Sequence, residues 1–322
     1  MIFFNRLGKG YIDMEKNMTG AVKMRKKRKA YIMLLFVIPA LIELILFNYV
    51  PMYGILIAFQ DYVPGDSIVS SDAIWIGFNN FKQFFQTPNF WDLMKNTFFL
   101  CLFGFLIGFP LPVIVALLLN SSFNKKMSKV MQTIYIAPHF ISLVVMVGIL
   151  SIFFGTNGVI NNIAVKLGGD RFSYFLDPKA FRPLYIFSGV WQDFGWSAII
   201  YLAALSGVDP QLHEAATIDG ASRVQRIIHV DFPAIFPTVS MLLILSIGGL
   251  MGVGYEKVLL MQTSANLDAS EIISTYVYKK GLTGFTLPGY ATAVGLFNSI
   301  INVILLVFAN TVAKRFSENT LF

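Results

Sequence analysis

Charged residues are scarce in this sequence. Asp, Glu, Lys and Arg make up 13% of the 322 residues and 56% are hydrophobic, whereas an ordinary soluble domain is about a quarter charged and about half apolar. The apolar residues gather in runs of roughly 20 or more, the length that crosses a hydrocarbon layer about 30 Å thick. The composition argues against an ordinary soluble domain and predicts an all-α membrane protein.

Cysteine and histidine are nearly missing. Cys101 is the one cysteine and lies in an apolar run, so this chain alone cannot build a disulfide framework or a thiolate metal site. The three histidines, His139, His213 and His229, are widely separated. We therefore expect inert packing for Cys101, and no metal or cofactor bound by this chain.

Signatures of other function classes are also absent from the sequence. There is no glycine-rich phosphate loop of the GxxxxGK[ST] kind, so any nucleotide must be handled by another subunit. A membrane-embedded transferase would need a convergent acid, base or metal constellation, and none is evident. An ion channel or ion-coupled transporter would require more intramembrane charge or internal repeats. These classes remain alternatives with little in the sequence to favour them.

The net charge of +7 is unevenly distributed. Nine of the 25 Lys and Arg residues lie in the first 30 residues, six of them between Lys23 and Lys29, directly before an apolar run. This is the pattern of a cytoplasmic segment attracted to anionic lipid headgroups. We expect contact with membrane lipid and no nucleic acid. We do not expect a secretory signal here, because the apolar run is too long and no small-residue cleavage site follows it.

About six transmembrane helices can be drawn after the basic segment of residues 1–30. A transmembrane domain of residues 31–313 would contain spans at 31–59, 93–119, 133–154, 183–206, 234–253 and 289–313, followed by a tail at 314–322. With both termini inside, the cytoplasmic segments carry 16 Lys and Arg residues and the outer segments carry eight. Because short cytoplasmic loops collect Lys and Arg, this bias predicts cytoplasmic termini.

The first outer loop is aromatic and amphipathic. Its segments WIGFNNFKQFF and TPNFWDLMKNTFF have apolar residues at helical spacing, and Trp75 and Trp91 suit a membrane interface. The pattern predicts short helices on the outer membrane surface, and a docking surface for an external partner is the alternative.

Polar residues inside two of the spans are candidates for a substrate pathway. In the fourth span the segment WQDFGW combines rings that can stack on a sugar with groups that can hydrogen-bond to it: Trp191, Gln192, Asp193 and Trp196. In the sixth span Asn298 and Asn302 are four residues apart and share one face. The alternative for these polar side chains is hydrogen bonding between helices.

The predicted coupling loop, residues 207–233, has strong local signals. Asp209 followed by Pro210 is a typical helix start, and Asp219-Gly220 ends that helix. We expect Leu212 and two alanines on one face of this helix. A second amphipathic helix follows, with Val224 and Ile228 on its apolar face and two arginines opposite, and it should stop at Phe232-Pro233. Both helices could simply edge the membrane.

The spacing within this loop resembles a known motif. EAATIDG (Glu214 to Gly220), nine residues, then VDFP (Val230 to Pro233) is similar to the EAA motif of binding-protein-dependent ABC importer permeases, in which EAA, three residues and Gly precede I-x-L-P by nine residues. Val230 and Phe232 replace the usual Ile and Leu. Other stretches resemble the carbohydrate-uptake, maltose-permease-like branch: PMYGILIAFQDY, IGFNNFKQFF, GYEKVLLM and EIISTYVYKKGL.

The resemblance implies a type I ABC importer fold with a cytoplasmic coupling helix, in a bacterial inner membrane. The implied partners are a sister permease forming a heterodimer, two ATPase subunits that bind ATP and Mg²⁺, and an extracytoplasmic solute-binding protein. The residues implied to couple to the ATPase are Glu214, Ala215, Ala216, Asp219 and Gly220. Transport would proceed by alternating access. The substrate implied is an oligosaccharide, acidic or neutral, and a permease for another solute is the alternative.

Overall fold

The computed structural model describes Leu34–Lys314 except for residues 72, 123 and 285. The predicted basic segment of residues 1–30 and almost all of the tail at 314–322 lie outside the described residues. The chain divides into two compact units, Met1–Leu56 and Ile57–Phe322. All regular elements of the described residues are helical, and an isolated bridge pairs Gln60 with Trp75. The predicted all-α membrane fold is therefore confirmed.

The helix that begins at Leu34 changes its winding before a proline. The candidate span Leu34–Phe59 contains a π turn at Ile45–Tyr49, then α2 (Val50–Met52) and the 3₁₀ segment Tyr53–Phe59. In the π turn the amide of Val50 donates to the carbonyl of Ile45. The wider turn gives room to Pro51, whose ring would otherwise clash with a carbonyl one turn earlier.

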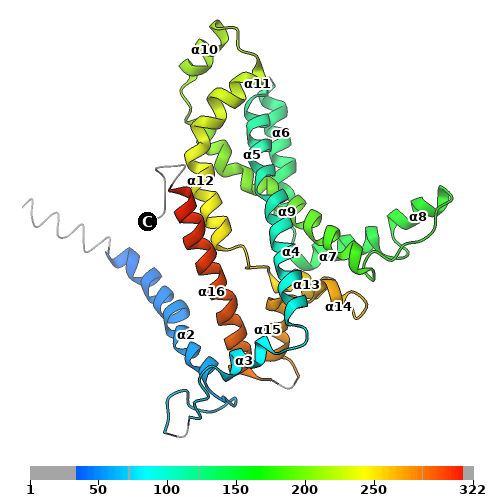
Figure 1. The fold of residues 1–322 in the computed structure, drawn as a ribbon. Coiled ribbons are helices and arrows are strands. Elements are labelled where there is room, and N and C mark those ends of the chain that lie inside the picture. Colours follow the sequence, from blue (N-terminus) through cyan, green and yellow to red (C-terminus); the bar gives the residue numbers. More distant parts are fainter. Residues whose placement is uncertain (1–33, 72, 123, 285, 315–322) are drawn as a thin grey trace, which may run out of the picture. The chain divides into compact units, whose positions relative to one another are not determined.

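The second unit holds the remaining helices (Figure 1). The longer ones are α4 (Phe90–Gly108), α5 (Pro110–Asn120), α6 (Lys125–Ile136), α7 (Leu143–Phe154), α9 (Pro178–Ser206), α12 (Phe232–Gly248) and α16 (Pro288–Ala313). The shorter ones are α3 (Asn79–Phe85), α8 (Val159–Lys166), α10 (Pro210–Ile218), α11 (Arg223–Arg226), α13 (Tyr255–Met261), α14 (Leu267–Ser270) and α15 (Ile273–Leu282), with a 3₁₀ turn at Ala137–Phe140 and a π turn at Ile227–Asp231.

Five helices of the described residues are long and apolar enough to cross a membrane, compared with about six expected. They are Leu34–Phe59, Phe90–Asn120, Leu143–Lys166, Arg223–Gly248 and Pro288–Ala313. The predicted span 183–206 is helical throughout, as part of the 29-residue α9, but it is not among the five. Gln192 and Asp193 lower its hydropathy, and such residues face a protein interior or a polar pathway when a helix lies in a membrane.

Two predicted boundaries differ in the structure. The predicted span at 133–154 is not one helix: α6 ends at Ile136, a 3₁₀ turn holds Pro138, and α7 begins after the capping residue Ser142. The segment TPNFWDLMKNTFF does not form a surface helix of its own. From Phe90 onward it is the first part of α4, and in α3 Phe81 and Phe84 are buried rather than lying on an open surface.

Helix packing places two groups of short helices at opposite ends of this unit. α5 packs along α9, α4 also packs on α9, and α12 packs along α16. α10 and α11 lie at one end, where α5 ends and α12 starts, whereas α3, α13 and α15 lie at the other end (Figure 1). The buried cluster around Val113, Tyr201 and Ile235 joins α5, α9 and α12.

Candidate functional site: the coupling loop and a polar cavity

The helix α10 begins and ends where the sequence predicts. The Asp209 side chain accepts from the amide of Gln211 at 2.9 Å, and Pro210 is the first helical residue. At the other end Gly220 has φ +78°, and the amide of Ala221 donates to the carbonyl of Ala216 at 2.9 Å. This is a Schellman ending, which needs a residue in the left-handed region. The motif therefore places Gly220 at the distance from Ala216 that a Schellman ending requires.

The motif side chains face outward from this chain. No residue of α10 is buried; Glu214, Ala215 and Asp219 are exposed and Ala216 is half-buried. The apolar residues of the same helix are also open, Leu212 at 52% and Ile218 at 86% exposure. The expected apolar face is therefore present, and the described residues of this chain leave it largely uncovered.

The segment after Gly220 differs from the expectation. α11, the π turn at Ile227–Asp231 and α12 run on as one helix from Arg223 to Gly248, and Pro233 lies in the first turn of α12 instead of ending the helix. In the π turn the amide of Phe232 donates to the carbonyl of Ile227. As at Pro51, the wider turn accommodates the missing amide and the bulk of the proline ring.

The apolar and basic residues of that segment lie on opposite sides, as the sequence predicts, and the basic side faces the protein. Val224 and Ile228 are exposed at 64% and 53%, whereas Arg223 and Arg226 line a cavity. Arg226 donates from Nη1 to the hydroxyl of Thr217 at 3.0 Å, which ties α11 to α10. Near a membrane the polar side of a helix turns to protein and the apolar side turns to lipid, which is the reverse of a soluble helix.

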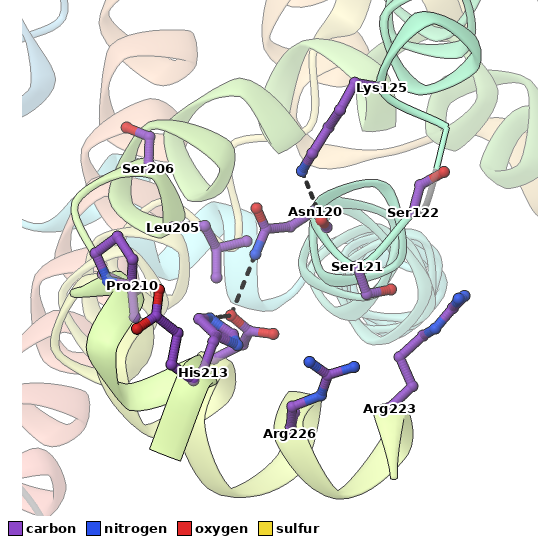
Figure 2. Close-up of a pocket in the computed structure, with 13 residues that line it drawn as sticks. Asn120, Ser121, Ser122, Lys125, Leu205, Ser206, Pro210, His213, Arg223 and Arg226 are labelled. Carbon is purple, nitrogen blue, oxygen red and sulfur yellow. Dashed lines mark hydrogen bonds and ion pairs between the residues drawn. The ribbon is translucent and has the colours of Figure 1, made fainter. Parts of the chain in front are cut away.

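The cavity beside α10 has a volume of about 530 Å³. Figure 2 shows that side chains from four segments meet around it. The lining residues are Asn120, Ser121, Ser122 and Lys125 from the end of α5 and the following turn, Leu205, Ser206 and Val208 from the end of α9, Pro210, His213 and Glu214 from α10, and Arg223, Arg226 and Asp231. The cavity is polar and rich in charge.

A buried carboxylate connects α10 to two long helices. His213 Nε2 lies 3.2 Å from Asp231 Oδ1, and the Asp231 side chain is 2% exposed. Asn120, the last residue of α5, donates from Nδ2 to the same oxygen at 3.1 Å (Figure 2). Because a buried carboxylate is costly unless it is paired and hydrogen-bonded, these contacts hold α10 to the start of α12 and the end of α5. Sequence reasoning missed this connection.

The predicted pathway residues of α9 meet a residue that the sequence did not single out. Asp193 Oδ1 lies 3.0 Å from Nδ1 of His139, and the His139 ring stacks on Trp196 with centroids 4.5 Å apart. Gln192 donates to the carbonyl of Ile141 at 2.8 Å. Trp191 and Trp196 are each 46% exposed. Asp193, Trp196 and His139 thus form a partly open polar and aromatic group.

Gly195 allows this group to form. A Cβ atom at Gly195 would lie 2.0 Å from the carbonyl oxygen of Tyr135, at the end of α6. The close approach of the two backbones brings the 3₁₀ turn with His139 onto α9. A glycine inside an aromatic segment is the one signal in the sequence that could have suggested such a contact.

A second cavity, of about 470 Å³, includes two of the predicted pathway residues. Gln192 and Asp193 line it, together with residues of α4 and of α13. Lys257 of α13 also lines it and was not singled out from the sequence. Trp196 lines an adjacent cavity of about 420 Å³ that shares Gly104 and Gly108 with this one.

Asn298 and Asn302 lie elsewhere. Asn298 donates to the carbonyl of Met251 at 3.2 Å, and Asn302 accepts from the amide of the same residue at 2.9 Å. Met251 lies in the irregular segment after α12, where backbone groups lack helical partners. The two side chains do share one face of α16, and both bond to the backbone of the non-helical segment that follows α12. The structure does not bring them to the cavity of Gln192 and Asp193.

Among the described residues there is no group of three or more His, Cys, Asp or Glu side chains arranged to hold a metal ion. Cys101 is buried and unpaired. The contacts observed among the candidate residues are hydrogen bonds, ion pairs and ring stacking.

Comparisons with known proteins identify the family. Residues 108–318 match the family described as binding-protein-dependent transport system inner membrane component. Protein LplB of Bacillus subtilis (strain 168) is 42% identical over 92% of both chains. The polygalacturonan/rhamnogalacturonan transport system permease protein YteP of the same organism is 41% identical over 96% of this chain and 94% of that one.

Solved structures agree with this assignment. A chain of a bacterial ABC transporter involved in the import of the acidic polysaccharide alginate superposes with a TM-score of 0.81, at 35% identity, over 90% of this chain and 98% of that chain. A chain of a bacterial alginate ABC transporter in complex with an alginate pentasaccharide-bound periplasmic protein gives a TM-score of 0.81 at 34% identity, over 91% of this chain and 98% of that chain. The chain belongs to the family of inner membrane components of binding-protein-dependent transport systems.

Proposed function

We propose that this chain is the membrane-spanning permease of an oligosaccharide importer, driven by ATP that separate cytoplasmic subunits hydrolyse. The family supports the transport role. The sugar is supported by the names of two similar proteins, which refer to polygalacturonan/rhamnogalacturonan and to alginate. The lack of a GxxxxGK[ST] segment in the sequence supports ATP and Mg²⁺ binding on the partner subunits.

The complete importer contains a sister permease, two ATPase subunits and an extracytoplasmic solute-binding protein. The binding protein is supported by the family description and by the complex formed by the alginate transporter. The chain crosses the bacterial inner membrane several times with both termini in the cytoplasm, which the excess of Lys and Arg in the proposed inner segments supports. α10 is then cytoplasmic, and α13 is on the outer side.

The ATPase docks on α10. Leu212, Ala215 and Ile218 give this helix an open apolar surface, and the exposed Glu214 supplies a charge for a basic group of the partner. Large exposed apolar side chains next to polar ones are typical of protein interaction sites. Gly220 and the Schellman ending fix the direction in which the chain leaves this surface.

The observation that carries the coupling mechanism is the bonding of His213 and Asn120 to Asp231. When closure of the ATPase dimer moves α10, His213 pulls on the carboxylate at the start of α12. Asn120 transfers the same displacement to the end of α5. Two membrane helices therefore move with α10, as alternating access requires.

The sugar passes along the polar side of α9. Gln192 and Asp193 offer hydrogen bonds at the wall of a cavity, and the rings of Trp191 and Trp196 are partly open. Residues of this kind recognise sugars through hydroxyl groups and through the apolar faces of the ring. Asn298 and Asn302 stabilise the backbone at Met251 and are not part of this pathway.

Reconstitution tests the proposed function. The tagged chain should co-purify with ATPase subunits and a sister permease, and in proteoliposomes the complex should accumulate labelled oligosaccharide only when ATP and binding protein are both present. Accumulation without ATP, or hydrolysis of ATP by this chain alone, would contradict the proposal. A complex that accumulates a different solute but not oligosaccharides would leave the coupling mechanism standing and exclude the sugar.

A further inference from the structure

Lys257 is a buried cation on a cavity wall. It belongs to α13, outside the candidate membrane spans, and only 7% of it is exposed. Among the described residues that line the 470 Å³ cavity, Lys257 is the only Lys or Arg. Lysine is almost never this buried unless its charge is paired. Its position therefore requires an explanation.

The ammonium group of Lys257 contacts one residue, Tyr185, in two ways. Lys257 Nζ donates to the carbonyl of Tyr185 at 3.0 Å and lies 4.8 Å from the centre of the Tyr185 ring. Gly189 makes room for it, since a Cβ atom there would be 3.1 Å from Nζ. An ammonium has three N–H donors, and the carbonyl uses one of them. The side chain is fixed in place with hydrogen-bonding capacity to spare.

The missing element is an anion. Among the described residues no carboxylate oxygen lies within 4.0 Å of Lys257 Nζ, since the ion pairs there are His139–Asp193, His213–Asp231 and Lys279–Glu271. Burial lowers the pKa of Lys257 to about 8, and the more distant Asp193 offsets part of that effect. At neutral pH the group is therefore still mostly charged, but easily neutralised.

The rest of the cavity suits a sugar. Its other titratable groups are Tyr185, Asp193, Tyr255 and Glu256, and Gln192 adds an amide. Asp193 is engaged by His139 at 3.0 Å. Carboxylate, amide and hydroxyl groups can bond to sugar hydroxyls, and rings can contact the faces of the sugar. A neutral sugar would have no charged group to pair with the ammonium of Lys257.

We propose that Lys257 binds a carboxylate of the transported oligosaccharide, so that the preferred substrates are acidic sugars of the uronide class. This inference rests on the proposed function and specifies its substrate. A uronide supplies the missing anion on a ring that also carries the hydroxyl groups for Gln192 and Asp193. Since a hydrogen bond to a charged group is worth about 1.5–3 kcal/mol, the acidic form should bind about ten- to 100-fold more tightly than the uncharged form.

Direct binding to the purified complex of permeases and ATPases tests this without the selectivity of the binding protein. The probes are trigalacturonate and its fully methyl-esterified form, which differ in the charge of the carboxyl groups. Titration calorimetry at pH 7 should give at least tenfold tighter binding of the acid to the wild-type complex. Lys257→Met should bring the two dissociation constants within about twofold, and Lys257→Arg should keep a preference for the acid.

The pH dependence provides a second readout. Raising the pH from 7 to 9 should reduce the preference of the wild-type complex, because Lys257 loses its charge near pH 8, and should leave the Lys257→Met complex unchanged. Lys279→Met, which removes a lysine paired with Glu271 away from this cavity, should keep the full preference. Equal affinity of the wild type for both probes, or equal weakening of both by Lys257→Met, would overturn the inference. Because ATP-driven uptake is measured separately, either result leaves the proposed transport function standing.

Discussion

His213 and Asp231 lie in different helices of the coupling loop and approach to 3.2 Å between Nε2 and Oδ1. His213 is on the outward-facing α10, and Asp231 is the last residue of the π turn that leads into α12. If this pair carries the movement of the ATPase, breaking it should leave ATP hydrolysis running while uptake fails. His213→Ala and Asp231→Asn should each lower the amount of sugar imported per ATP hydrolysed.

A double-mutant cycle measures the interaction energy between His213 and Asp231. For contacting residues the coupling energy is roughly 0.5–3 kcal/mol, so the double variant should be little worse than the poorer single one. The matched control is His229→Ala, since His229 is exposed and its ring bonds only to the nearby carbonyl of Gln225 among the described residues. Fully additive effects on the import ratio would contradict a direct link.

The effect of replacing Gly220 should depend on the backbone strain that the new residue causes and not on the size of its side chain. Its φ is +78°, and a Cβ atom there would meet nothing within 4 Å. Gly220→Val should disturb the end of α10, because left-handed backbone costs an ordinary residue about 1–2 kcal/mol. Gly220→Asn should be milder, since asparagine tolerates this region. Comparing uptake and ATPase co-purification for both variants checks this, and equal defects would mean that side-chain size matters instead.

Glu214 is predicted to act through the ATPase partner. Its side chain is exposed, so Glu214→Ala should leave the thermal stability of the chain unchanged. Co-purification of the ATPase should weaken, or uptake per ATP should fall. Glu214→Gln, which keeps the size and removes the charge, should behave like alanine if a basic group of the partner is involved. Full activity of both variants would remove Glu214 from the coupling surface.

Gly195 should tolerate no side chain. The carbonyl oxygen of Tyr135 would lie 2.0 Å from a Cβ atom, and neither this carbonyl nor the Cβ atom can move without its helix backbone. Gly195→Ala should therefore force α6 away from α9 and destabilise the chain by about 1–3 kcal/mol or more, lowering its melting temperature in detergent. Gly148→Ala, in α7 with nothing within 4 Å of the new atom, should have little effect. A normal melting temperature for Gly195→Ala would refute the close packing.

The sequence predicted the coupling loop best where the signals are local. Asp209-Pro210 and Gly220 start and stop α10 through bonds to their immediate neighbours, and these follow from residue type alone. The partner of His213 depends on how α12 returns to α10, which no short-range pattern contains. The sequence separated Arg223 and Arg226 from Val224 and Ile228 correctly, but it could not say which of the two faces meets protein, because a helical pattern does not contain that information.

Tertiary contacts also explain why the sequence did not reveal the roles of His139 and Lys257. α9 was expected as a span, and its polar residues were correctly noted, yet His139 reaches Asp193 only because Gly195 lets two backbones approach. Lys257 lies in the segment GYEKVLLM, which the sequence singled out only for its resemblance to the carbohydrate-uptake branch. Its burial results from packing of α13 on α9, a tertiary contact that composition does not reveal.

Substitution of Asp193 distinguishes the two roles considered for the polar residues of α9, which are the substrate pathway and hydrogen bonding between helices. Its side chain is 62% exposed and bonds to His139 at 3.0 Å, so replacing it should not destabilise the bundle. Asp193→Asn keeps the size and a hydrogen bond to His139 but removes the charge, and it should slow sugar uptake while assembly with the ATPase and the sister permease stays normal. Size-exclusion chromatography and uptake into proteoliposomes check both parts.

The matched control for this prediction is Asp170→Asn, an exposed aspartate outside the lining of the cavities described above. It should match the wild type in both measurements. Loss of assembly in the Asp193 variant would instead assign the residue to helix packing, because a side chain that only faces the pathway has no reason to hold the complex together. Normal uptake with normal assembly would exclude Asp193 from the pathway.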